Sequence, residues 1–226
     1  MKIFAVVCTR TKEFSKVTQD LFNTLSSFGV EVKVMTNQTS IFDAYKKGLY
    51  KCNAAGNDIV IFCHDDIELL DTKADFIGKL AHCLNPNAGI VGPAGTTLLG
   101  PDAVWWNHDH WKAGFHSGAV YHRSDEGQVY NTEYGPFKKV VVLDGLFLAA
   151  RKAVWDAVGM GKPEYFEGDW DFYDLHYTSK AHNLKLENHT IPIKIIHHSA
   201  GEIVGRDSWH KNREAFIRNT ELPLMY

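Results

Sequence analysis

Three apolar strand-like segments, each followed by a helix-like segment, fill the first ninety residues. The strand-like segments are residues 3–8, 30–35 and 59–63, and the helix-like segments are residues 14–28, 41–52 and 72–84. The first and third strands are apolar without interruption, which is typical of strands that helices cover on both faces. Because such repeats form parallel sheets with right-handed crossovers, we predict an α/β fold whose first half is Rossmann-like.

The pattern changes after residue 89. Residues 102–134 hold three tryptophans and four histidines with little periodicity, and we predict a long functional loop there. No linker-like segment divides the chain, so we expect residues 1–226 to form one domain. Further strands are expected at 90–91, 140–143, 146–149 and 191–196, and further helices at 152–158, 170–181 and 208–220.

Charge and composition exclude several classes of protein. The net charge of −3 argues against a generally basic nucleic-acid coat. No apolar run reaches the roughly 18 residues that a membrane span needs, and the N-terminal segment reads as a strand rather than a signal peptide. The four cysteines form no C-x-x-C pair, so we expect buried thiols in a reducing, cytoplasmic compartment. They are Cys8, Cys52, Cys63 and Cys83.

Polar residues directly follow four of the predicted strands. In an open parallel sheet, ligands bind beyond the carboxyl ends of the strands, so these positions are the first candidates for a site. Two adjacent carboxylates after an apolar strand are costly unless a cation or hydrogen-bond donors compensate them, and a divalent ion would also neutralise a diphosphate. Alternatively, the acids belong to a solvated turn. The four groups are Cys8-Thr9-Arg10, Thr36-Asn37, His64-Asp65-Asp66 and His197-His198.

Four sequence blocks follow one another along the chain: I-V-I-F-C-H-D-D-I-E-L, V-L-D-G-L-F-L-A-A-R-K-A-V-W, F-Y-D-L-H and I-I-H-H-S-A-G. They resemble successive motifs of glycosyltransferase family 2, and most of all its StrF-like branch. The resemblance covers nearly the whole chain and implies the GT-A fold, a Rossmann-like three-layer αβα sandwich with a mixed, mostly parallel sheet. It implies a nucleotide-sugar-binding half at 1–98 and an acceptor-binding and catalytic half at 99–226.

The same resemblance implies a divalent metal, Mn²⁺ or Mg²⁺, and a nucleoside-diphosphate sugar as donor. Asp66 matches the last acid of the family's D-x-D motif, which holds the metal, and Asp65 is expected near the ribose or the metal's waters. His64 replaces the first acid. His197 matches a histidine that often completes the metal site, and the sequence leaves open whether His197 or His198 faces inward.

Donor contacts are implied at five further positions. The loop with Thr9 and Arg10 matches the segment that wraps the nucleobase and ribose, and Asn37 replaces a base-contacting acid. Asp144 and Gly145 match groups placed against the donor sugar, where glycine permits close backbone approach. The alternatives are a surface charge for Arg10 and an ordinary turn for the Asp-Gly pair.

An inverting transfer needs a carboxylate that takes the acceptor proton. Asp174 matches the family's base, and Asp171 and Asp169 are the alternatives close by. All three could instead be acids that favour a helix N-terminus. We expect inversion, with Asp174 or Asp171 as the base.

The sequence constrains the identity of the acceptor less than that of the donor. Trp105 or Trp106 is expected to form an exposed stacking platform, whereas His108 and His110 are read as ordinary loop residues. A glycan, a lipid-linked sugar, a small molecule and an extruded modified nucleic-acid base all remain open. Two other functions also remain: a nucleotide-sugar-binding protein without turnover, and a metal-dependent phosphohydrolase.

Overall fold

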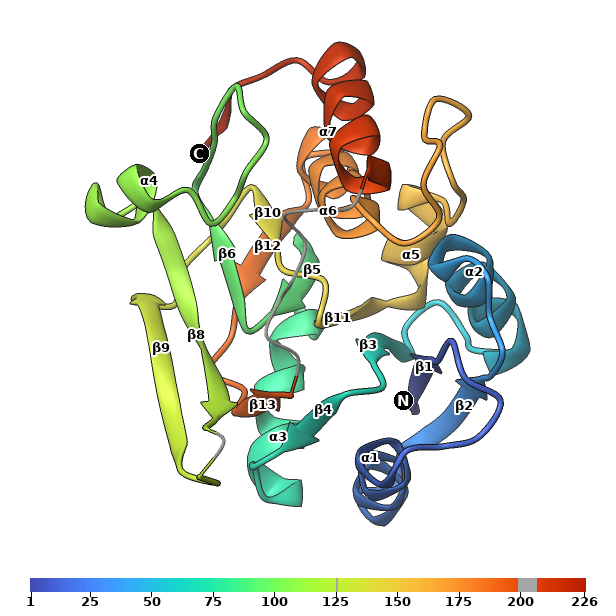
Figure 1. Cartoon of the computed structure of the whole chain (residues 1–226). Coiled ribbons are helices and arrows are strands. Elements are labelled where there is room, and N and C mark those ends of the chain that lie inside the picture. Colours follow the sequence, from blue (N-terminus) through green and yellow to red (C-terminus); the bar gives the residue numbers. More distant parts are fainter. Residues whose placement is uncertain (125, 199–206) are drawn as a thin grey trace.

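A six-stranded sheet forms the centre of the computed structural model, which describes residues 1–124, 126–198 and 207–226 (Figure 1). Its strands are β1 (Ile3–Cys8), β2 (Glu31–Met35), β3 (Ile59–His64), β5 (Ala88–Gly92), β11 (Phe147–Arg151) and β12 (Glu187–Thr190), in the order β12-β5-β11-β3-β1-β2. Only β11 runs antiparallel to its neighbours, β3 and β5. The predicted mixed, mostly parallel sheet is therefore confirmed.

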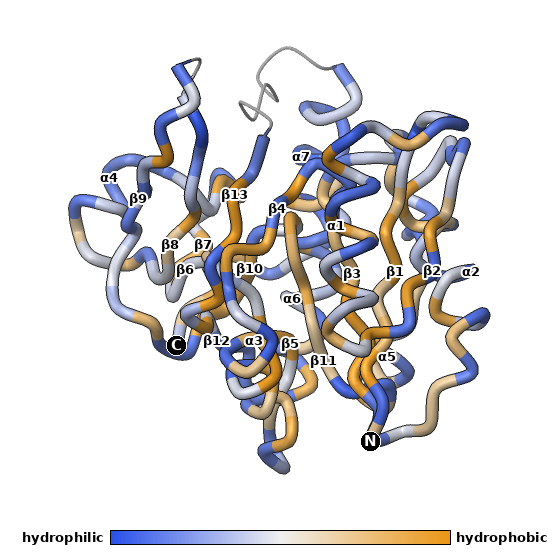
Figure 2. Tube along the Cα trace, turned by 90° about the horizontal axis from the view of Figure 1, so that it is seen from below, coloured by the Kyte–Doolittle hydropathy of each residue, from blue (hydrophilic) through white to orange (hydrophobic). Residues whose placement is uncertain are grey.

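Helices cover both faces of this sheet (Figure 1). On one side lie α1 (Lys16–Ser27) and α3 (Lys73–Leu80), with the 3₁₀ turn η1 (Ala81–Leu84), and on the other lie α2 (Ile41–Cys52), α5 (Lys152–Val158) and α6 (Tyr173–Asn183). Phe62 of β3 packs on Tyr45 of α2 and Trp155 of α5. Figure 2 shows the hydrophobic course of β1 and β3 between these helices. The three-layer αβα arrangement is confirmed.

Short polar side chains fix where the helices begin. The Ser40 hydroxyl accepts a hydrogen bond from the backbone N–H of Asp43, and Thr72 does the same for Asp75. Such caps satisfy N–H groups that have no partner within the helix. Gly48 then allows α2 to lie close on β1, because a Cβ there would collide with Val6.

A second sheet stands beside the first and contains β10 (Val142–Leu143), β6 (Ala94–Thr96), β8 (His116–Arg123), β13 (Ile195–His197) and β4 (Ile67–Leu69), with β9 (Val129–Gly135) paired to β8. The expectation of a long loop at residues 102–134 is therefore wrong. This segment contains the short helix α4 (His108–Lys112) and the β8–β9 hairpin. The hairpin escaped prediction because most of β9 is exposed and lacks alternating apolar residues. Both sheets take strands from residues 1–98 and from residues 99–226.

The C-terminal part completes the fold. Helix α7 (Asp207–Asn219) packs near α6, and β14 (Leu224–Met225) pairs with β7 (Leu98–Leu99). All four cysteines are free and buried, as expected. No helix in the described ranges is long and apolar enough to cross a membrane.

Candidate active site

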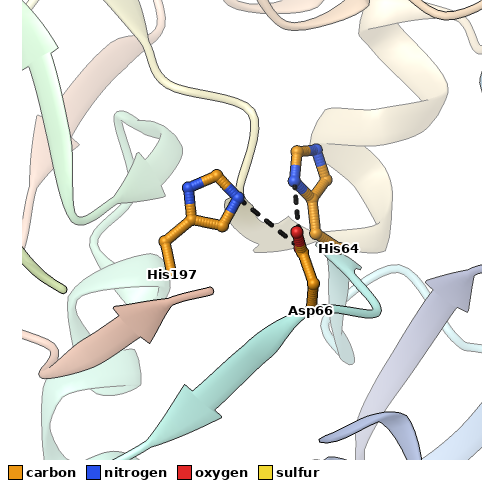
Figure 3. Close-up of side chains that lie close together, drawn as sticks. All are labelled: His64, Asp66 and His197. Carbon is orange, nitrogen blue, oxygen red and sulfur yellow. Dashed lines mark ion pairs between the residues drawn. The ribbon is translucent and has the colours of Figure 1, made fainter. Parts of the chain in front are cut away.

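Three side chains from two strand ends meet at the carboxyl edge of the main sheet. His64 ends β3, Asp66 follows it, and His197 ends β13, which pairs with β4 so that His197 lies opposite Ile67. Asp66 Oδ1 lies 3.7 Å from His64 Nδ1 and 3.5 Å from His197 Nε2 (Figure 3). One ligand atom of each residue falls within 4.8 Å of the others. In the described part of the chain, no other group has this geometry.

These residues fit a divalent cation. Asp66 Oδ1 and His197 Nε2 are both buried and have no hydrogen-bond partner among the described residues. Buried polar atoms are almost always hydrogen-bonded, and leaving one unpaired costs about 1–3 kcal/mol. Two imidazole nitrogens and a carboxylate oxygen are ordinary ligands of first-row divalent metals. A bound ion would satisfy both unpaired atoms at once.

The charges at this cluster favour an ionised carboxylate. Burial opposes ionisation of Asp66, but its contact with His197 and the His64 charge lower the pKa of Asp66 on balance. Burial likewise opposes a charge on His197, yet Asp66 raises the pKa of His197 overall. For His64, burial prevails and lowers its pKa.

Tyr173 positions the His64 ring, and this role was not recognised from the sequence. Its hydroxyl lies 2.6 Å from Nε2 of His64, which leaves Nδ1 directed at Asp66. Gly145 makes room for this contact, because a Cβ at Gly145 would collide with the Tyr173 hydroxyl. The signal that could have found Tyr173 is its position in F-Y-D-L-H, where it replaces an acid of the resembled family.

The backbone just before Tyr173 is strained. Phe172 adopts the left-handed conformation, with φ 67°, which costs a non-glycine residue about 1–3 kcal/mol. Its ring packs on Trp209 and Phe216 of α7, with centroids 5.5 and 5.7 Å away. This packing holds the start of α6, and with it Tyr173 and Asp174, at the carboxyl edge.

Asp174 carries the most strongly perturbed carboxyl group of the site. Burial and the charge of Asp144 raise the pKa of Asp174 to about 7, against the opposing effect of backbone N–H groups. Asp144 itself accepts a hydrogen bond of 3.0 Å from the Leu146 N–H. A Cβ on Gly145 would lie 3.0 Å from Cβ of Asp174, so the predicted pair Asp144-Gly145 does meet Asp174.

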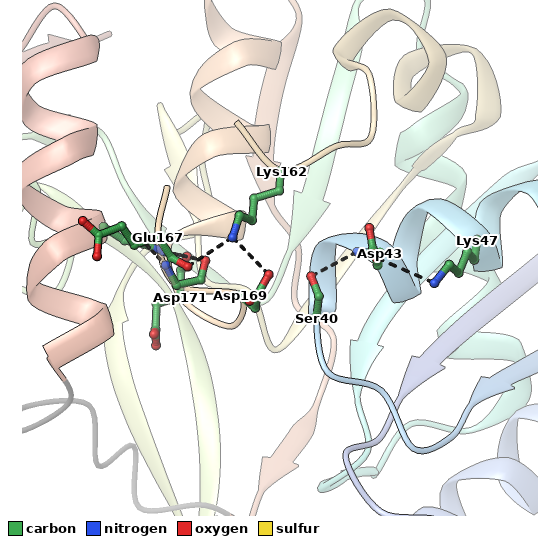
Figure 4. A network of polar contacts seen from close by, with 9 residues as sticks. Ser40, Asp43, Lys47, Lys162, Glu167, Asp169 and Asp171 are labelled. Carbon is green, nitrogen blue, oxygen red and sulfur yellow. Dashed lines mark hydrogen bonds and ion pairs between the residues drawn. The ribbon is translucent and has the colours of Figure 1, made fainter. Parts of the chain in front are cut away.

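The two alternative acids are engaged elsewhere (Figure 4). Asp171 is buried, and its carboxylate accepts a 2.8 Å hydrogen bond from Ser208 of α7. Asp169 pairs with Lys162 at 3.1 Å. Of the three acids, the structure places Asp174 against Gly145 and joins the other two to polar side chains.

Backbone hydrogen bonds connect the loops that follow β1 and β2. Thr9 is buried and its N–H donates to the carbonyl of Met35, while the Asn37 N–H donates to Thr11. The Arg10 guanidinium lies 4.1 Å from the ring centroid of Trp170. Arg10 is thus held by a cation–π contact. Asp65 is half-buried, and its backbone carbonyl accepts a hydrogen bond from the Thr18 hydroxyl of α1.

The structure resolves which adjacent histidine faces Asp66. His198 Nε2 lies 3.4 Å from Glu68, which also accepts a hydrogen bond from Arg123. His197 therefore faces Asp66 and His198 faces Glu68, because successive residues of an extended segment point to opposite sides. The residues Ser199 to Gly201 of the I-I-H-H-S-A-G block lie outside the described ranges.

The expected aromatic platform needs a correction. Trp105 is only 2% exposed and packs on Tyr134 and His116, so it is not an exposed stacking residue. Its burial follows from the unpredicted β8–β9 hairpin, which covers it. Trp106 is half-buried and contacts Trp209 of α7.

Comparisons with known proteins agree with this architecture. Two solved structures share the fold: A197 from STIV, with 11% identity over 88% of this chain and 86% of that one and a TM-score of 0.50; and GalNAc-T7 with UDP, GalNAc and Mn²⁺, with 11% identity over 96% of this chain and a TM-score of 0.57. The match covers 48% of the GalNAc-T7 chain. The αβα architecture and these neighbours confirm the GT-A-type fold.

No curated protein matches the sequence significantly. A family model described as "Glycosyltransferase like family" matches residues 5–219. Since that match spans nearly the whole chain, the protein belongs to this glycosyltransferase-like family.

Proposed function

We propose that the protein transfers a sugar from a nucleoside-diphosphate sugar to an acceptor, with a divalent cation held by His64, Asp66 and His197. The observation that carries this proposal is that two buried candidate ligand atoms at the carboxyl edge, Asp66 Oδ1 and His197 Nε2, have no hydrogen-bond partner among the described residues. Family membership supports sugar transfer, and GalNAc-T7, with UDP and Mn²⁺, is a fold neighbour consistent with it.

A divalent ion held by His64, Asp66 and His197 would neutralise the charge of the donor's diphosphate. Mg²⁺ prefers oxygen ligands, whereas imidazole suits transition metals. With two histidines and one carboxylate, the cluster favours a transition metal over Mg²⁺. We propose Mn²⁺ as the working ion, because the fold neighbour GalNAc-T7 is described with Mn²⁺.

Asp174 is the proposed base of an inverting transfer. A general base works best when its pKa is near the operating pH, and the pKa of Asp174 is raised to about 7. The ionised carboxylate would take the proton from the acceptor hydroxyl as that oxygen attacks the anomeric carbon. The bond from that carbon to the diphosphate oxygen would break, and the nucleoside diphosphate would leave. Asp144 would accept hydrogen bonds from the donor sugar, with Gly145 allowing close approach.

The donor's nucleoside is assigned to the loops after β1 and β2. Thr9, Arg10 and Asn37 would enclose the base and ribose, and Asp65 would reach the ribose or water around the metal. Residues 1–98 supply these groups, and residues 99–226 supply Asp174 and the acceptor side, including Trp106. We also retain the StrF-like branch as the proposed position within glycosyltransferases.

The test is an incubation with UDP-, GDP- and dTDP-sugars, Mn²⁺ and a panel of saccharide and alcohol acceptors, followed by mass spectrometry of nucleotides and acceptors. Wild type should release a nucleoside diphosphate and add the sugar to an acceptor. Asp174→Asn should reduce this turnover about 10²–10⁴-fold without weakening nucleotide binding. Asp169→Asn, in the same segment, serves as the matched control and should retain turnover. Cleavage between the phosphates would instead show a phosphohydrolase, and nucleotide-sugar binding without product from any acceptor of the panel would favour a binding protein.

A further inference from the structure

The β8–β9 hairpin presents aromatic side chains next to the proposed active site. Ile196 of β13 pairs in parallel with Tyr121 of β8, so the next residues along, His197 and His122, share one face of the second sheet. On the neighbouring strand, His122 lies opposite Tyr130. The two rings stack with centroids 5.4 Å apart and planes 30° apart.

The aromatic surface continues toward the reacting groups. Tyr134 of β9 lies 5.6 Å from Trp111, measured between ring centroids. Burial, with a smaller effect of the negative charge of Asp144, raises the pKa of Tyr134 to about 12. We call His122, Tyr130, Tyr134 and Trp111 the hairpin aromatic face.

Parts of this face are open to solvent. Tyr130 is 54% exposed and Trp111 is 39% exposed, whereas Trp105, which packs on Tyr134, is buried. Exposed aromatic rings rimmed by polar residues often mark a binding site. Because His122 shares a sheet face with His197, its stacking partner Tyr130 extends this aromatic surface from the proposed metal site.

The charge of the hairpin limits what can bind there. Between residues 108 and 138, which hold α4 and the hairpin, the sequence has three basic residues, Lys112, Arg123 and Lys138, and four acids. Arg123 follows His122, so it lies on the opposite face of β8, where it donates a 2.9 Å hydrogen bond to Glu68. Single-stranded nucleic acids bind to surfaces that combine aromatic rings with Lys or Arg along the phosphates. The segment that carries the hairpin aromatic face has no such excess of positive charge.

We propose that the hairpin aromatic face binds the acceptor, and that the acceptor is a neutral saccharide with sugar rings that stack separately on Tyr130 and on Trp111. This inference rests on the proposed transferase function and names its second substrate class. The negative π-faces of the aromatic rings attract the polarised C–H groups on one side of a sugar ring. A hydroxyl at the inner end of such a saccharide would point toward Asp174.

The test is saturation-transfer NMR on the whole chain without Mn²⁺, which would broaden the signals. The probes are neutral methyl hexopyranosides and α- and β-linked disaccharides, compared with hexose 6-phosphates and a short oligothymidylate. Wild type should transfer saturation to ring C–H protons of at least one neutral saccharide. Tyr130→Ala and Trp111→Ala should each reduce that transfer at least threefold. Val129→Ala alters an adjacent residue on the opposite face of β9 that is also exposed, at 45%, and should change nothing.

Three results would overturn the inference: no transfer to any neutral saccharide, equal transfer in Tyr130→Ala, or binding of only the phosphorylated probes. Thermal unfolding of each variant separates a lost contact from a lost fold. The readout is independent of donor chemistry. If saccharide binding depends on Tyr130 but no nucleotide sugar is consumed, the proposed function fails and the binding face stands. If nucleotide sugars are consumed and Tyr130→Ala binds saccharides normally, the acceptor assignment fails alone.

Discussion

The hydroxyl of Tyr173 lies 2.6 Å from Nε2 of His64, so the other ring nitrogen, Nδ1, is left facing Asp66. A histidine that binds a metal through one nitrogen commonly forms a hydrogen bond through the other, which fixes its tautomer and orientation. Tyr173 is buried at the start of α6, one residue before Asp174. The same helix end therefore serves both the proposed metal site and the proposed base.

Replacing Tyr173 with Phe should weaken metal binding about 10–100-fold, because the His64 ring loses its orienting partner. Isothermal titration with Mn²⁺ measures this directly. Tyr177→Phe is the matched control on the same helix, since the Tyr177 hydroxyl is buried without a hydrogen-bond partner among the described residues. It should bind Mn²⁺ as wild type does. Equal affinity in Tyr173→Phe would refute the positioning role.

Gly145→Ala should destabilise the protein by about 1–3 kcal/mol, because the new Cβ would overlap the Tyr173 hydroxyl and lie 3.0 Å from Cβ of Asp174. Urea unfolding gives the free energy, and Mn²⁺ titration shows whether the displaced Tyr173 also disturbs His64. Gly161→Ala is the control, since its Cβ would meet nothing within 4 Å. If Gly145→Ala is as stable as wild type, Gly145 does not pack this closely on Tyr173.

The Asp174 carboxyl group should make stability depend on pH. Its pKa is raised to about 7 in the folded protein, from an ordinary value of 3.8, so ionisation disfavours folding. The wild type should therefore lose stability relative to Asp174→Asn as pH rises from about 4 to 8, by up to a few kcal/mol. Urea unfolding of both proteins in EDTA at these pH values measures the difference. A difference that does not change with pH would contradict the raised pKa.

Much of the main sheet could be predicted because its strands are apolar on both faces and its helices carry capping residues. β1 and α5 have the predicted bounds, and Ser40 caps α2 as its spacing indicates. The β8–β9 hairpin could not be predicted in this way, because β9 is mostly exposed and its order comes from pairing with β8. The burial of Trp105 follows from that same hairpin.

The candidate site also has parts that the sequence predicts and parts that it does not. The ends of β3 and the last core strand were predictable, so Asp66 and its neighbours were identified from their position after apolar runs. Choosing His197 over His198 required the register of β13 with β4, because a shift of one residue reverses the face. The Tyr173–His64 contact joins residues 109 positions apart, and no local pattern indicates it.

Nucleotide binding that depends on Asp66 tests the central claim most directly. Thermal unfolding should be followed with UDP-, GDP-, CMP- and dTDP-sugars, each with Mn²⁺ or EDTA, for wild type, Asp66→Asn and the control Asp20→Asn on the exposed side of α1. At about 100 times the dissociation constant, a ligand stabilises by about 2.7 kcal/mol, or roughly 5–10 °C for a chain of this size. We expect such a rise for one nucleotide, only with Mn²⁺, in wild type and Asp20→Asn but not in Asp66→Asn. An equal rise in EDTA, or in Asp66→Asn, would contradict a metal-assisted donor site at this cluster.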